Sequence, residues 1–184
     1  MRWCTGMNFY KHDLLDLIAA LAVSAGSDRR EFDPLLRPAP GQFHPPAVET
    51  DMWEVFLLVL ETNGDLCQVI PGSMDPFRGG PADLLIPAPE NRSRHWTLNL
   101  ELKQEIRMNM LLPGFAKLMP DQLDYVKSGL NRYERGEPLG SLYRFCLPYI
   151  GENDSRKEYR KRMENLIRTI RSACRIRPEP PAET

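Results

Sequence analysis

The fold is decided by the stretch MWEVFLLVL at residues 52–60, an apolar run of strand length rich in β-branched and aromatic side chains. Asn63-Gly64 follows it, and this dipeptide is a strong hairpin signal because both residues tolerate a positive φ. The segment LCQVI at residues 66–70 then returns as a second strand and stops at Pro71-Gly72. The pattern predicts a central antiparallel hairpin with Trp53 in the core.

Short strands separated by turns continue after this hairpin. Residues 82–86 and 105–112 are further strand candidates, and residues 96–102 alternate between apolar and polar side chains, as a half-buried strand does. A helix through Leu123, Val126 and Leu130 follows, with Asp121 as its N-cap and Pro120 just before it. Short strands closed by a helix predict an α+β fold, either a small β-barrel or a bent antiparallel sheet.

Amphipathic helices are predicted on both sides of this sheet. Apolar side chains recur at helical spacing in residues 11–25 and again in residues 154–177. Each apolar stripe either packs on the chain's own barrel or docks into a groove of a partner protein. The partner contacts would be Leu14, Leu17, Ile18, Leu21, Tyr159, Met163, Leu166, Ile167 and Ile170.

The C-terminal helix also holds a local excess of positive charge. Residues 154–177 contain nine Lys and Arg against three Asp and Glu, although the whole chain has a net charge of −1. Such a helix either follows a phosphate backbone or leaves its charges in water. The nucleic-acid contacts would be Arg160, Lys161, Arg168, Arg171 and Arg175.

Three segments follow from these patterns. Residues 1–46 form an N-terminal helix and a Pro-rich strap, residues 47–133 form the barrel with its closing helix, and residues 134–184 form a basic helical extension with a disordered tail. No signal peptide or membrane-spanning run is present, which predicts a cytoplasmic protein without membrane contacts. The four cysteines form no C-x-x-C pair and the three histidines are isolated, so we expect no metal site, disulfide framework or cofactor.

Residues 52–130 resemble the MazF/PemK toxin family, whose members are small SH3-like barrels that cleave RNA as dimers. The order and spacing of five segments carry the resemblance. They are an apolar strand at residues 52–61, VIPGS at 69–73, LLI at 84–86, QEIR at 104–107 and a closing helix at 118–130. The resemblance therefore implies an SH3-like barrel.

The chain departs from this family where the family's reactive residues lie. Active members place an Arg before the first matching strand, in a Gly-x-Arg-Pro context, but residues 43–50 read FHPPAVET. Ser73 matches a Thr or Ser of the family, yet RNA cleavage also needs a base and a cation at the phosphate. If the chain is a metal-independent endoribonuclease, the catalytic residues would be Ser73, Arg78 and Arg107.

The chain resembles the MazF/PemK barrel but lacks the family's reactive Arg. This combination predicts a non-catalytic regulatory or adaptor protein that acts through protein–protein contacts. The chain also resembles, in size and general character, accessory proteins encoded beside type III-E CRISPR effectors and an extracytoplasmic-function sigma factor. That resemblance implies a partner of sigma or anti-sigma type and a role in antiviral defence. Two alternatives stay open: a sequence-specific endoribonuclease toxin of a toxin–antitoxin system, and a nucleic-acid-binding module that contacts RNA.

Overall fold

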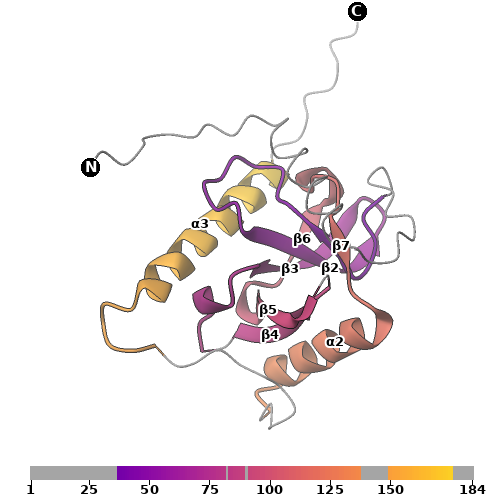
Figure 1. Ribbon diagram of the computed structural model, residues 1–184. Coiled ribbons are helices and arrows are strands. Elements are labelled where there is room, and N and C mark those ends of the chain that lie inside the picture. The colour runs from indigo at the N-terminus through magenta and orange to yellow at the C-terminus, as the bar shows by residue number, and fades with distance from the viewer. Residues whose placement is uncertain (1–36, 82, 90, 138–148, 176–184) are drawn as a thin grey trace, which may run out of the picture. The chain divides into compact units, whose positions relative to one another are not determined.

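The computed structural model describes residues 37–81, 83–89, 91–137 and 149–175 (Figure 1). These residues belong to one compact unit, residues 33–184. They form a curled antiparallel sheet, a half-barrel of seven strands, with one α-helix on each side of it. The predicted α+β class and bent antiparallel sheet are therefore confirmed. The predicted helix at residues 11–25, with Leu14, Leu17, Ile18 and Leu21, lies outside the described residues.

The central hairpin consists of β2 (Val55–Asn63) and β3 (Leu66–Ser73). Gly64 and Asp65 make the two-residue loop, and Gly64 adopts the positive φ of 61° that a tight turn needs. β2 begins three residues later than predicted, at Val55 rather than Met52. Residues 52–55 instead form a turn, closed by a 3.2 Å hydrogen bond from the Val55 amide to the Met52 carbonyl. This turn points Trp53 into solvent, with 71% of the side chain exposed, so its prediction as a core residue is wrong.

The remaining strands extend the sheet on both sides of the hairpin in the order β4-β5-β3-β2-β1-β7, with β6 also paired to β3. They are β1 (Gln42–His44), β4 (Asp83–Ala88), β5 (Asn91–Asn99), β6 (Gln104–Arg107) and β7 (Ala116–Lys117). β3 bonds β6 along its first half and β5 at its last two residues. One strand thus serves two neighbours on the same edge, which makes the sheet curl.

Three sequence assignments change in the structure. Residues 42–44, assigned to the Pro-rich strap, pair with β2 and β7 and so belong to the sheet. The predicted strands at 96–102 and 105–112 both end early in 3₁₀ turns. These turns are η2 (Leu100–Leu102) and η3 (Met108–Met110), and a third, η1 (Pro76–Arg78), follows β3.

Both faces of β2 are buried, which explains why its sequence is continuously apolar rather than alternating. Phe56, Leu58 and Leu60 face one core, which α2 (Pro120–Glu134) covers with Val126 and Leu130. Val55, Leu57 and Val59 face a second core on the other side, which α3 (Ser155–Arg175) covers. Trp96 lies in the first core. The N-cap of α2 is Met119 with Pro120 in the first turn, so the prediction of Asp121 as the cap was two residues late.

The apolar stripe of α3 supplies five of the twelve buried residues of the second core. They belong to the same core as Cys67, Val69 and Ile106 of the sheet and Met52 of the turn before β2. They are the five α3 residues predicted as partner contacts, namely Tyr159, Met163, Leu166, Ile167 and Ile170. The structure therefore corrects that assignment: because a 100°-wide apolar stripe lowers the free energy most by covering an apolar sheet face, the stripe packs on its own domain.

Candidate functional site

The end of β3 is the point from which the candidate site is built. At Gly72 a Cβ atom would lie 2.3 Å from the Thr97 carbonyl oxygen and 2.5 Å from the Phe56 ring, so only glycine fits there. Ser73 follows and is 1% exposed. Its Oγ accepts a 3.0 Å hydrogen bond from the Asp75 amide, a local turn that directs the chain into η1.

Arg78 lies beside this strand end and is held by two contacts. Its guanidinium pairs with the Asp75 carboxylate at 3.3 Å and lies 5.4 Å from the ring centroid of Tyr159. Asp75 in turn accepts a 2.9 Å bond from the Phe77 amide, so the whole η1 loop is fixed. Ser73 and Arg78, which we predicted as catalytic partners, therefore line one small pocket.

Arg107, the third predicted catalytic residue, lies elsewhere on the sheet. It is paired in the β3–β6 ladder with Leu66, at the opposite end of β3 from Ser73. Ser73 is seven residues along the strand from Leu66, which corresponds to about 23 Å at roughly 3.3 Å per residue. A single phosphate cannot contact both ends, so Arg107 does not share a site with Ser73 and Arg78.

Helix α3 forms the remaining wall of the pocket with Tyr159, Arg160 and Met163. The enclosed space measures about 10 Å³, which is room for about one water molecule. Burial raises the pKa of the Tyr159 phenol, so the ring remains neutral at ordinary pH. The helix thus covers Ser73 with an aromatic ring and leaves no space there for a nucleotide.

Arg160 is the centre of an ion-pair cluster that joins α3 to the rest of the domain. Its side chain, 17% exposed, pairs with Glu101 and with Glu164 at 3.0 Å, and lies 3.7 Å from the Asp83 carboxylate. Glu101 also accepts a 2.9 Å hydrogen bond from the Tyr133 hydroxyl of α2. One guanidinium therefore connects α3 to β4, to η2 and, through Glu101, to α2.

Asp83 is the most perturbed carboxyl group of this cluster. Burial raises its pKa to about 6, although a 2.8 Å hydrogen bond from the Gly80 amide and the charge of Arg160 both oppose the rise. Asp83 Oδ1, Asn99 Oδ1 and the Tyr159 hydroxyl are buried without a well-formed hydrogen bond in the described residues. Ser73 consequently faces polar groups that are closed off from solvent, and Asp83, the only carboxyl group among the described residues that line the pocket, already faces Arg160.

Neither histidine of the described residues, His44 or His95, lines this pocket. His44 is buried between Gln42 and the Leu112 carbonyl, which lies 2.9 Å from its Nδ1, and burial lowers its pKa. It is therefore a core histidine with its hydrogen bonds satisfied. His95 lies on β5, and His12 lies outside the described residues. Within the described ranges, no three His, Cys, Asp or Glu side chains are placed to bind a metal ion.

The five basic residues predicted to bind nucleic acid fall into separate environments. Arg160 belongs to the ion-pair cluster and faces the sheet. Lys161, Arg168 and Arg171 are exposed on the outer side of α3, and Arg175 is the last residue of the helix. Sequence periodicity alone did not separate Arg160 from the others, because it lies at the border between the apolar and basic faces.

Asp83, Glu101 and Tyr133 are the site residues that the sequence analysis missed. One signal in the sequence could have identified this cluster, namely a carboxylate, Asp83, at the start of an apolar strand. A charged group that is buried there needs a partner to offset the loss of hydration. The helix that supplies this partner is about 75 positions away in the sequence, so no local pattern could identify Arg160.

Neither protein-family models nor curated proteins match the chain. In the parts that the structure describes, no helix is both long enough and apolar enough to span a bilayer.

Proposed function

We propose that the protein is a non-catalytic, MazF/PemK-like regulatory or adaptor protein that acts through protein–protein contacts. The burial of Ser73 under α3 is the observation that carries this proposal. Cleavage of RNA requires a 2′-hydroxyl and a phosphate to reach a base and a cation. Tyr159 occupies the approach to Ser73, and the nearby cation Arg160 already pairs with Glu101 and Glu164.

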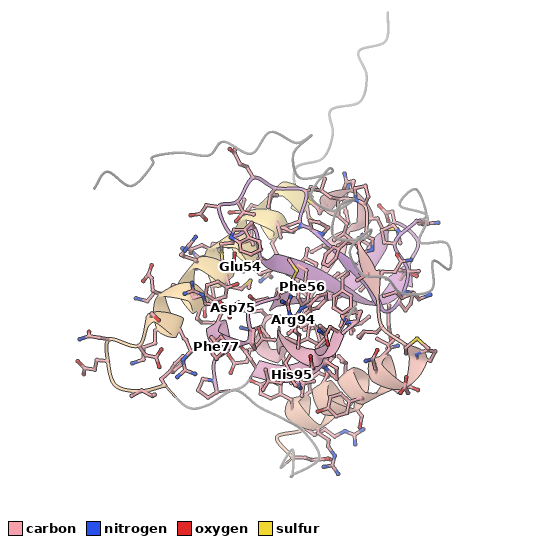
Figure 2. All side chains as sticks on the ribbon, viewed as in Figure 1. Glu54, Phe56, Asp75, Phe77, Arg94 and His95 are labelled. Carbon is pink, nitrogen blue, oxygen red and sulfur yellow. The ribbon has the colours of Figure 1, made fainter. Side chains whose placement is uncertain are left out.

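Two exposed aromatic side chains beside this closed site support protein binding. Trp53 is 71% exposed and Phe77 is 84% exposed. Their segments are joined by a 3.0 Å bond from the Met74 amide to the Glu54 carbonyl, and Figure 2 shows Glu54, Asp75 and Phe77 along the same side of the sheet. Aromatic residues of this kind dominate the energy of protein interfaces, whereas in water they contribute little to folding.

The proposal has a more specific form, in which the partner is a sigma or anti-sigma type protein or a component of a type III-E CRISPR system. It rests on the general resemblance of the chain to such accessory proteins. The identity of a bound protein decides between this form and an unrelated regulatory complex.

The test is affinity purification of the full chain from its native host, with and without RNase. We expect one stoichiometric protein that stays bound after RNase treatment and is lost when Trp53 and Phe77 are both changed to Ala. Met119→Ala is the matched control, because Met119 is an exposed apolar residue at the start of α2. A captured protein that is insensitive to the aromatic double variant contradicts the proposed surface, and capture of RNA alone contradicts the adaptor function.

A toxin-like endoribonuclease is the second candidate, favoured by one observation. Ser73 and Arg78 line the same pocket, which is the pairing that a displaced active site would need. This function requires α3 to leave the sheet, because Tyr159 otherwise covers Ser73. It predicts growth arrest on expression and RNA cuts that disappear in Ser73→Ala.

A further inference from the structure

The outer face of α3 presents a row of basic side chains that the core and the pocket do not use. Lys157, Lys161, Arg168 and Arg171 follow one another at steps of four, seven and three residues, so they project from one side of the helix. At roughly 1.5 Å per residue the row is about 21 Å long. We call these four residues the basic stripe.

The basic stripe differs from the other cations of α3 in lacking carboxylate partners. Arg156 pairs with Asp154 at 2.6 Å, Arg162 pairs with Asp51 at 2.7 Å, and Arg160 belongs to the cluster around Asp83. No ion pair involving the basic stripe occurs among the described residues. Glu164, the acidic residue on the same side, is drawn to Arg160 at 3.0 Å. Lys157 is half-buried, with its Nζ 5.8 Å from the centroid of the Tyr149 ring, and the other three side chains are exposed. The stripe is therefore a row of positive charge without carboxylate partners in the described residues.

We propose that the basic stripe binds the phosphate backbone of double-stranded DNA without sequence preference, an activity separate from the proposed protein contacts. The opposite side of α3 is buried on the sheet, so the basic side is the one that can face a duplex. Its cationic side chains would contact phosphates, which bind without regard to sequence. The chain's net charge of −1 supplies no general attraction to DNA, so binding depends on this local row.

The chemistry of the stripe favours a duplex over a protein or a single strand. Its exposed neighbours on α3 are polar, namely Glu158, Asn165, Thr169 and Ser172. A protein interface would need an apolar or aromatic anchor, and a single strand would need aromatic rings on which its bases stack. A straight, rigid row of charge matches the duplex, which carries roughly one phosphate charge per 1.7 Å of axis.

The salt dependence of binding measures the number of phosphates contacted. Each phosphate neutralised contributes about 0.9 to the slope of log K against log salt, so four contacts predict a slope of about 3.6. Changing Lys161, Arg168 and Arg171 to Gln removes three contacts and reduces the slope by about 2.7. Because these three side chains are exposed, the variant retains the fold.

The experiment is fluorescence anisotropy of a labelled DNA duplex of about two helical turns with the full chain, from low to physiological salt. The control variant changes Lys117, Lys127 and Arg135 to Gln, which alters the net charge equally but away from α3. Circular dichroism melting verifies that both variants fold. We expect the stripe variant to lose at least tenfold in affinity at low salt and the control variant to lose less than threefold.

Each other outcome overturns the proposal. Equal weakening by the two triple variants shows that binding is a general charge effect rather than a property of the stripe. If the wild type does not bind the duplex even at low salt, the protein lacks the proposed activity. Tighter binding of the matching single strand, of an RNA duplex or of polyglutamate identifies a different partner class.

Discussion

Replacement of Arg160 by Met tests whether the ion-pair cluster stabilises the position of α3. The substitution keeps the length and apolar stem of the side chain but removes the cation beside Asp83, Glu101 and Glu164. Asp83 is then left buried with no cation, whereas Glu101 and Glu164 can turn toward water. The expected loss of stability therefore depends on the charge of Asp83 and hence on pH.

The magnitude follows from the pKa of Asp83. Its folded pKa of about 6 exceeds the ordinary 3.8 because of burial, so its protonation favours the folded state, and stability from this group falls as pH rises from about 4 through 6. Without Arg160 the folded pKa rises further, and each unit costs about 1.4 kcal/mol at high pH. We expect Arg160→Met to cost about 3 kcal/mol at pH 8 and about 1 kcal/mol at pH 5, where Asp83 is neutral in the variant.

Urea unfolding at both pH values measures this difference. Asp83→Asn combined with Arg160→Met should restore most of the stability lost at pH 8, because no buried charge remains. Arg171→Met is the matched control on the exposed side of the same helix, with an expected change within about 0.5 kcal/mol. A loss from Arg160→Met that is equal at pH 5 and pH 8, or that persists in the double variant, would refute the coupling between Arg160 and Asp83.

Three further predictions concern packing. Gly72→Ala should cost at least about 2 kcal/mol in urea unfolding, because the new Cβ would meet the Thr97 carbonyl at 2.3 Å. A loss below about 0.5 kcal/mol would contradict the close approach. Ile170→Ala should lower the free energy of unfolding by about 2–4 kcal/mol, because Ile170 of α3 is fully buried in the second core. A neutral effect would show that α3 does not pack on the sheet as described. Cys67 should resist iodoacetamide in the folded protein, because burial raises the pKa of its thiol to about 11, and rapid labelling of Cys67 would contradict its place in the second core.

The central hairpin and the fold class were predictable because their signals are local. The apolar run before Asn63-Gly64 and the return strand specify β2 and β3 within a few residues. Trp53 was misassigned because its apolar neighbours continue the strand pattern, whereas a turn at residues 52–55 decides its orientation. β1 was missed because three residues between prolines carry no periodicity, and only pairing with β2 and β7 makes them a strand.

The candidate site was only partly predictable because its parts come from distant segments. Ser73 and Arg78 were named from the sequence only as candidates for an endoribonuclease, and it is the structure that places them in one pocket. Arg107 was added from the family resemblance, and the sheet register places it at the other end of β3. The position of α3 over Ser73 depends on tertiary packing, which an amphipathic pattern leaves open between the chain's own sheet and a partner.

The most direct test of the central claim, that α3 closes the Ser73 site of a non-catalytic protein, is sequencing of RNA 5′ ends after expression of the full chain. Wild type and Ser73→Ala are compared with an empty vector at equal protein levels. Our account predicts the same RNA ends in all three samples. Cuts at a defined sequence in the wild type that vanish in Ser73→Ala would contradict it and establish the endoribonuclease instead.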